Sequence, residues 1–308
     1  MIDTREAAQQ KIQELCDGAW AVSALAIVLE RGVDADEPVV RAALGVLTAH
    51  GLCDAAGAPG PGFAALIAGD GAVVARSDLR STLGTVNHAV DAASTPGAAI
   101  AGWRADDERL VEAQGLVSQA ASAQLARAFA AMPGVDERLR AGGAVLDVGA
   151  GAAGLGIALA AAYPRVRVVG IEPSQVAVAV GRRRIAEAGV ADRVELRAHG
   201  GEALIDVDAY DLIYVAQMFM PDAVIDGVLA ASVRALRPGG FLVTAAVCGP
   251  GDDVRAAIGR LRGEVWGGGA RFAEDVVARL RAAGLPGAAV GPRPPGSQLW
   301  PVLGRRAR

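Results

Sequence analysis

The sequence of 308 residues has few of the side chains that most often carry metal or redox chemistry. It contains three histidines and three cysteines, and Cys16, Cys53 and Cys248 are too far apart to form a C-x-x-C pair. This pattern indicates neither a disulfide framework nor a zinc site, and we predict no metal. Aromatic residues make up only 4% of the chain, so each tryptophan is a rare feature.

Lysine is also scarce, and acidic residues outnumber basic ones. Lys11 is the only lysine, the formal net charge is −4, and the first 100 residues hold six basic against twelve acidic side chains. Binding to nucleic acid or to an anionic membrane through charge needs the opposite balance. No apolar run of about 18 residues lacks a charge or a turn former, and the N-terminus has no signal-peptide pattern. We therefore predict a cytoplasmic protein with no nucleic-acid and no membrane partner.

The most informative segment spans residues 145–154, where an apolar strand pattern runs into a glycine-rich turn. The apolar residues end at Val148 and are followed by Gly149, Gly151 and Gly154. Glycine lets the backbone turn sharply and approach a ligand closely. The helix expected next would point its free N–H groups at the same place. These features predict a cradle for a nucleotide-containing cofactor.

Two classes of cofactor use such a cradle. The G-x-G-x-x-G spacing, with Glu172 closing a second apolar strand at residues 168–171, fits a dinucleotide fold whose acid binds ribose hydroxyls. Asp147 discriminates between the two, because its carboxylate would repel a pyrophosphate but attract the cationic amino-acid part of S-adenosylmethionine. Electrostatics therefore favours S-adenosylmethionine and a D-x-G-x-G pattern, with Ala153 where a third glycine often falls. A nicotinamide-dependent oxidoreductase stays open as an alternative.

Further landmarks follow in order at residues 194–197, 200–204, 210–214 and 236–243. With the D-x-G-x-G turn, this ordered set resembles class I S-adenosylmethionine-dependent methyltransferases, from about residue 141 to the C-terminus. The resemblance implies an α/β fold with a Rossmann-like seven-stranded sheet, and Glu202 stands where the family more often has Asp. It assigns the methionine part, the ribose and the adenine of the cofactor to Asp147, Gly149, Ala150, Gly151, Glu172, Pro173, Glu202 and Ala203.

The N-terminal part has a mainly helical pattern. Apolar residues recur at helical steps, Gly32 is expected to end the first helix, Pro38 begins the next, and the Gly/Pro-rich residues 55–62 are expected to form a short wing. This winged-helix-like order before a cofactor domain resembles small-molecule O-methyltransferases of secondary metabolism. The resemblance implies a homodimer whose front domain pairs subunits and covers the active site. We predict a dimerisation domain at 1–85, a helical connector and substrate roof at 86–140, and the catalytic domain at 141–308.

In the second half, helical patterns at residues 155–162, 175–188, 222–236 and 273–283 alternate with the strand patterns. Such alternation predicts a parallel sheet with both faces covered. The last segment, residues 298–305, is expected to form the antiparallel final strand, with Pro301 at a bulge or an edge.

The candidates for catalysis lie beyond the strand at residues 210–215. In the O-methyltransferases that the chain resembles, a histidine at this point removes a proton from the acceptor, but the corresponding residue here is Met218. Methyl transfer would then depend on proximity, or on an acceptor that is already deprotonated. His88 in the connector is the candidate base, and Gln217 is the candidate contact to substrate or cofactor. A structural hydrogen bond is the alternative for Gln217.

The same region offers an apolar substrate pocket. Met218, Phe219 and Met220 lie together beyond the strand end, and Trp103 and Trp266 can stack on a flat substrate, with ordinary packing as the alternative. We predict a methyltransferase that acts on a small, largely apolar metabolite. A methyltransferase fold repurposed for cyclisation or hydroxylation is the second hypothesis, and a ligand-sensing DNA-binding regulator is the non-enzyme alternative.

Overall fold

The computed structural model describes residues 4–103, 106–130, 132–293, 297 and 299–308, without the side chains of 122–128 and 130. The chain divides into two compact units, Met1–Arg80 and Ser81–Arg308. The division falls inside the long helix α4 (Gly69–Ser94). The domain boundaries expected near residues 85 and 140 stay predictions.

The first unit is helical. Helices α1 (Thr4–Arg31), α2 (Pro38–Ala49) and α3 (Pro61–Leu66) join the start of α4. As predicted, α1 ends immediately before Gly32 and α2 begins with Pro38 at its first turn. In the segment expected to form a wing, Cys53 and Pro59 form an antiparallel bridge, and the backbone bonds Asp54 N to Ala58 O (2.8 Å) and Gly60 N to Leu52 O (2.9 Å) cross the same turn. The winged-helix assignment stays a prediction.

Helix α1 contains a long apolar stretch. One 18-residue window of it has a mean hydropathy of 1.4, and it is the one helix among the described residues long and apolar enough to cross a membrane. Only 17% of that window is buried. Core helices and signal sequences meet the same criterion, so the expected absence of a membrane partner stays a prediction.

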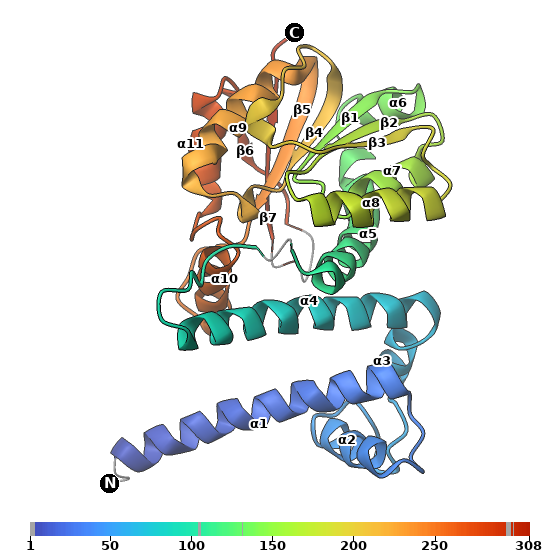
Figure 1. Cartoon of the computed structure of the whole chain (residues 1–308), viewed down its shortest axis with the longest axis vertical. Coiled ribbons are helices and arrows are strands. Elements are labelled where there is room, and N and C mark those ends of the chain that lie inside the picture. Colours follow the sequence, from blue (N-terminus) through green and yellow to red (C-terminus); the bar gives the residue numbers. More distant parts are fainter. Residues whose placement is uncertain (1–3, 104–105, 131, 294–296, 298) are drawn as a thin grey trace. The chain divides into compact units, whose positions relative to one another are not determined.

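The second unit is built on a seven-stranded sheet with the order β3-β2-β1-β4-β5-β7-β6. The first five strands in this order are parallel, and β7 is antiparallel to both of its neighbours. This topology confirms the predicted Rossmann-like seven-stranded sheet (Figure 1). The strands are β1 (Ala144–Val148), β2 (Arg167–Ile171), β3 (Val194–Arg197), β4 (Tyr210–Val215), β5 (Leu236–Ala246), β6 (Ala289–Val290) and β7 (Trp300–Arg305).

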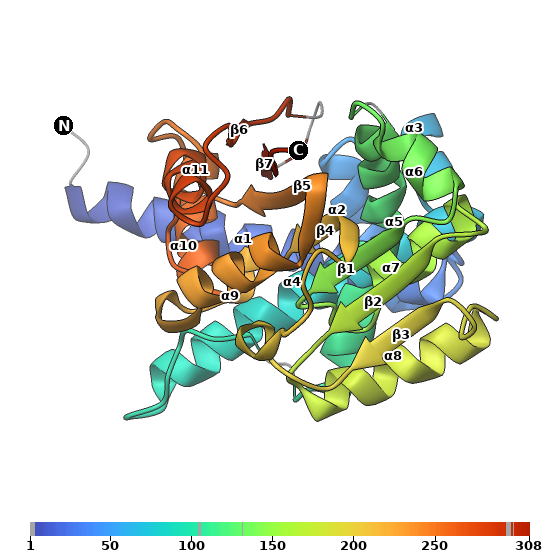
Figure 2. The ribbon, with the colours of Figure 1, turned by 90° about the horizontal axis from the view of Figure 1, so that it is seen from above.

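Helices cover both faces of this sheet because the central strands carry apolar side chains on both sides. One core packs Leu146 and Ile213 against α9 (Asp222–Ala235) and α11 (Ala273–Ala282). Helices on the opposite face pack against Val145 and Leu212. Figure 2 shows the helices and the sheet from above. These helices are α5 (Glu108–Ala130), α6 (Val135–Arg140), α7 (Gly154–Ala162) and α8 (Gln175–Glu187). Helix α10 (Val254–Val265) was not predicted.

The final strand is antiparallel as expected, but the predicted bulge or edge position of Pro301 is wrong. Strand β7 lies between β5 and β6, and the two-residue β6 takes the edge. The carbonyl of Pro301 accepts a hydrogen bond from Gly291 N (2.8 Å). Since the N and O of a strand residue point to the same side, the missing N–H of Pro301 faces short β6 and costs no bond to β5. Residue 298 lies outside the described residues.

Two glycines let α5 pass very close to the start of α7. A Cβ atom at Gly154 would collide with the carbonyl oxygen of Gly115 and would lie 2.8 Å from the backbone nitrogen of Gln119. A Cβ atom at Gly115 would lie 2.6 Å from the Cβ atom of Ala152. The last glycine of the G-x-G-x-x-G spacing is therefore required by helix packing, which needs no ligand.

Candidate cofactor and substrate site

The glycine turn follows β1, the strand at which the strand order of the parallel sheet reverses. Strand β1 is flanked by β2 on one side and by β4 on the other, so its carboxyl end is the switch point beside which open α/β sheets bind ligands. Gly149 N and Ala150 N both donate to Ile171 O, at 2.9 and 3.1 Å. Gly170 of β2 makes room for this turn, because a Cβ atom there would lie 2.8 Å from the Cβ atom of Ala150. The turn is thus held against the end of β2.

The turn needs left-handed backbone angles, which explains its glycines. Gly149 has a φ of 81° and Gly151 has a φ of 52°. No atom lies within 4 Å of a Cβ atom built at Gly151, so conformation requires the glycine there and a ligand can approach. At Gly149 a Cβ atom would lie 3.2 Å from both the Cβ atom of Ala216 and the Cε atom of Met220. Met220 therefore packs over the glycine turn.

Glu172 is fixed by backbone N–H groups on both of its carboxylate oxygens. Oε2 accepts from Gly151 N and Oε1 accepts from Ser174 N, each at 2.9 Å. The side chain is buried, and the adjacent Pro173 is exposed. Each oxygen keeps a lone pair, so the carboxylate can also accept from the two hydroxyls of a ribose. Its position fits the ribose role that the sequence assigned to it.

Asp147 is a buried acid without a cation. It is 3% exposed, and no hydrogen bond to its carboxylate is found within the part of the chain that the structure describes. Burial, and secondarily the charge of Glu172, raises the pKa of Asp147 to about 7. A bound ammonium would favour the ionised form, whereas a pyrophosphate would add like charge. The donor set therefore fits S-adenosylmethionine, which supplies an electrophilic methyl group when bound.

We expect cofactor binding to depend on pH through Asp147. Because its pKa of about 7 in the free protein would be lowered by a bound cation, binding releases a proton at acidic pH. The dissociation constant of S-adenosylhomocysteine, which keeps the ammonium, is therefore expected to be about tenfold higher at pH 6 than at pH 8. Calorimetry in buffers of different ionisation enthalpy measures both the affinity and the released proton. Equal affinity at the two pH values would contradict the assignment.

The predicted adenine side is formed by the short 3-10 helix η1 (Gly201–Ala203). A Cβ atom at Gly201 would lie 2.9 Å from Val228 and 3.0 Å from Val148, so η1 packs on α9 and on the end of β1. Glu202 and Ala203 are both exposed at this edge. Both side chains are accessible to an adenine ring, and this role stays a prediction.

The structure places Gln217 in a structural network. It begins the 3-10 helix η2 (Gln217–Phe219) and is 2% exposed. Its Nε2 donates to Ala245 O (2.6 Å), and its Oε1 accepts from Arg271 Nη1 (2.9 Å). Both ends of the amide are therefore used within the protein. This geometry favours the structural alternative over a direct contact with substrate.

The aromatic residues assigned to the substrate lie together. The ring of Phe219 is 5.0 Å from the ring of Trp103 and 4.8 Å from the ring of Trp266, both measured between centroids. Met218 is buried in the same cluster. The indole N–H of Trp266 is buried, with no hydrogen-bond partner in the described part of the chain. The cluster thus offers flat apolar surfaces.

Sequence reasoning missed two residues of this region. Tyr214 is the register partner of Asp147 on β4, and it also packs on the aromatic cluster. Burial, and secondarily Asp147, raises the pKa of Tyr214, so its hydroxyl stays protonated. The other is Arg271, which the sequence did not mark.

His88 lies half-buried on α4, and its role as a base stays a prediction.

The segment that carries the glycine turn matches a known protein family. The family description of a methyltransferase domain matches residues 145–240, which run from β1 into β5. A comparison with curated proteins found no match. The chain therefore contains a methyltransferase domain, whose methyl donor is S-adenosylmethionine.

The fold of the whole chain is that of O-methyltransferases. Mitomycin 7-O-methyltransferase MmcR is 20% identical, with a TM-score of 0.66 over 98% of this chain and 99% of that one. Human N-acetylserotonin methyltransferase, solved with S-adenosylmethionine, is 13% identical, with a TM-score of 0.71 over 100% of both chains. PigF, solved with S-adenosylhomocysteine, is 18% identical, with a TM-score of 0.63 over 99% of this chain and 100% of that one. At such identities the likeness shows the fold.

Proposed function

We propose that the protein transfers the methyl group of S-adenosylmethionine to a small, flat, largely apolar metabolite of secondary metabolism. The observation that carries this proposal is the aromatic cluster of Trp103, Phe219 and Trp266, whose central member Phe219 lies just after β4, in the same unit as the glycine turn. The flat rings favour stacking on a planar acceptor. The structural neighbours named above include enzymes that methylate small molecules.

We propose further that methyl transfer proceeds by positioning, without a histidine base. In-line displacement needs the acceptor atom about 3 Å from the methyl carbon, and a proton acceptor only if that atom carries a proton. Met218, Phe219 and Met220 supply no proton acceptor after β4, and the amide of Gln217 is already engaged. The acceptor that fits is one whose nucleophilic atom is unprotonated near neutral pH, such as an acidic phenol.

A radiolabelled S-adenosylmethionine assay with a panel of phenols of graded pKa, amines and keto acids tests this function. The expected result is labelled product with S-adenosylhomocysteine in equal amount, and rates that rise with the ionised fraction of the phenol. The Asp147→Asn variant is the control for cofactor-dependent turnover. If the acceptors yield no more S-adenosylhomocysteine than a blank without acceptor, the proposal fails.

The absence of a histidine after β4 also favours a second candidate, a methyltransferase fold that catalyses cyclisation or hydroxylation. The same assay separates the two, because a non-methylating reaction forms product without a matching amount of S-adenosylhomocysteine. A nicotinamide-dependent reaction is disfavoured by the uncompensated charge of Asp147.

We propose that the protein is a cytoplasmic homodimer that pairs through α1. Ile12, Leu15 and Val22 share one helical face and are 61%, 76% and 36% exposed, and Trp20 is 74% exposed. An apolar face of this kind indicates an interface. Size-exclusion chromatography with light scattering is expected to give twice the chain mass for the wild type and the single mass for Leu15→Glu. A monomeric wild type, or one that floats with liposomes, would contradict the pairing.

A further inference from the structure

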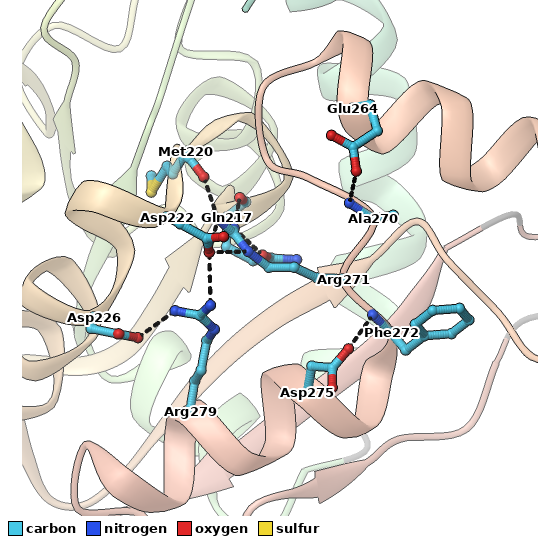
Figure 3. A network of polar contacts seen from close by, with 10 residues as sticks. All are labelled: Gln217, Met220, Asp222, Asp226, Glu264, Ala270, Arg271, Phe272, Asp275 and Arg279. Carbon is cyan, nitrogen blue, oxygen red and sulfur yellow. Dashed lines mark hydrogen bonds and ion pairs between the residues drawn. The ribbon is translucent and has the colours of Figure 1, made fainter. Parts of the chain in front are cut away.

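We infer that Arg271 is a positioning residue for methyl transfer. It holds the segment Gln217–Asp222 against the glycine turn at residues 149–151. This inference rests on the proposed function and concerns a residue that contacts neither cofactor nor acceptor in the scheme above. Arg271 lies just before α11, far in the sequence from the segment it holds. Figure 3 shows the network from close by.

The guanidinium of Arg271 binds four oxygen atoms of this segment. Nη1 donates to the carbonyl oxygen and to Oε1 of Gln217, at 3.0 and 2.9 Å. Nη2 donates to Met220 O (2.8 Å) and to Asp222 Oδ1 (2.9 Å), and Nε also donates to Asp222 Oδ1 (3.2 Å). A planar guanidinium can hold these groups simultaneously, but an ammonium cannot reproduce the fork.

The charge of Arg271 is balanced at the surface. Arg271 is 7% exposed and pairs with Asp222, whose side chain is 71% exposed. Arg279 shares the same carboxylate oxygen of Asp222 at 2.7 Å and also pairs with Asp226. Arg279 donates to the two carboxylates only, and no bond from it to a backbone oxygen is found among the described residues (Figure 3). It therefore provides a matched control, because its removal takes charge from Asp222 but leaves the four contacts of Arg271.

The segment Gln217–Asp222, which Arg271 holds, packs against both the glycine turn and the aromatic cluster. Met220, whose carbonyl Arg271 binds, packs over Gly149 of the cofactor turn. Phe219, one residue earlier, lies between Trp103 and Trp266. Gly268 closes the other side, since a Cβ atom there would lie 2.9 Å from Met218 Cα and nearer still to its carbonyl. The Arg271 side chain thus fixes both Met220, which packs on the glycine turn, and Phe219, which belongs to the aromatic cluster.

This arrangement matters most for an enzyme without a base. If proximity supplies the rate, then the relative position of methyl group and acceptor is the main catalytic variable, and a displacement of about 1 Å can cost 100-fold. Losing the contacts of Arg271 releases Gln217 and Met220 together. Arg271 is therefore expected to influence kcat more strongly than the binding of either ligand.

The first experiment compares Arg271→Ala and Arg271→Lys with Arg279→Gln, using the best acceptor from the panel. Rates are expressed per site that binds S-adenosylhomocysteine in calorimetry, so that unfolded protein does not count. We expect kcat to fall about 100-fold in both Arg271 variants, while KM for the acceptor and the dissociation constant change less than tenfold. Arg279→Gln is expected to stay within twofold of the wild type. Equal kcat per binding site in all four proteins would overturn the inference.

The second experiment uses guanidinium as a probe and needs no methyl acceptor. A surface cavity of about 500 Å³ is lined by Arg271, Asp222 and Arg279, so a small cation can enter. Near-ultraviolet circular dichroism is expected to show loss of the aromatic signal in Arg271→Ala and its recovery with millimolar, non-denaturing guanidinium. Methylammonium is expected to give no recovery. An unchanged spectrum in Arg271→Ala would refute the inference even if the proposed function holds, and failure of methyl transfer alone would leave this readout intact.

Discussion

Replacing Asp147 by asparagine is expected to weaken S-adenosylhomocysteine binding by about 10- to 100-fold. A hydrogen bond to a charged group contributes about 1.5–3 kcal/mol, and each 1.4 kcal/mol is a factor of ten in affinity. Asp147 is buried next to the turn and no cation neutralises it in the described structure, so we expect the ligand ammonium to be its partner. Asparagine keeps the shape but removes the charge. Calorimetric titration at pH 8 measures the change.

The same substitution is expected to stabilise the free protein. The pKa of Asp147 is raised to about 7 in the folded state, so the folded state holds a proton that the unfolded chain releases at lower pH. Stability therefore falls as the pH rises from about 4 to about 7, by up to about 4 kcal/mol for a shift of this size. Asparagine removes this loss. Urea unfolding at pH 5 and pH 8 should show a larger gain for Asp147→Asn at pH 8.

Glu172→Gln is the control for both halves of this result. Its carboxylate accepts from two backbone N–H groups, one on each oxygen. Glutamine has a single acceptor oxygen, so it can keep only one of these two bonds, and its NH₂ group then faces the other N–H. It is expected to weaken the cofactor complex without a comparable gain in stability. An Asp147→Asn variant that binds S-adenosylhomocysteine as tightly as the wild type would show that the carboxylate does not meet the ammonium.

Replacing Gly154 by alanine is expected to lower the free energy of unfolding by about 1–3 kcal/mol. The added Cβ atom would meet backbone atoms of α5, at Gly115 and Gln119, which cannot rotate away as a side-chain end can. The helices must then separate, and α5 loses its contact with the turn before α7. Urea denaturation followed by far-ultraviolet circular dichroism measures the loss.

Gly227→Ala is the matched control within the same unit. Gly227 lies in α9, and no atom lies within 4 Å of a Cβ atom built there. Because alanine is the better helix former, this variant is expected to gain up to about 1 kcal/mol. If Gly154→Ala were as stable as Gly227→Ala, the close approach of α5 and α7 would be wrong.

The cofactor turn could be predicted from the sequence because its requirements are local. The left-handed angles of Gly149 and Gly151 need glycine wherever such a turn occurs, and the order of strand, turn, helix and acid lies within about 30 residues. The family description confirms the methyltransferase domain. Ala153 also follows this logic, since it adopts a φ of 59° where a glycine would be less strained.

The polar network after β4 could not be predicted because its contacts are not local. Arg271 is 54 residues from Gln217 and 49 from Asp222, and the chain contains many arginines with no mark to distinguish this one. The sequence left Gln217 open between substrate contact and structural bond, and only the packing of the 267–272 loop favours the second. Helix α10 was missed although Val254, Ile258 and Leu261 recur at helical spacing; unlike the apolar faces of α9 and α11, this one is exposed in the structure.

Parallel calorimetric titrations of the wild-type protein at pH 8 with S-adenosylhomocysteine and with a reduced nicotinamide dinucleotide test the central claim most directly. If Asp147 beside the glycine turn accepts a cationic amino-acid group, S-adenosylhomocysteine binds once per chain and the dinucleotide gives no heat. Binding of the dinucleotide instead, with no heat from S-adenosylhomocysteine, would contradict the account.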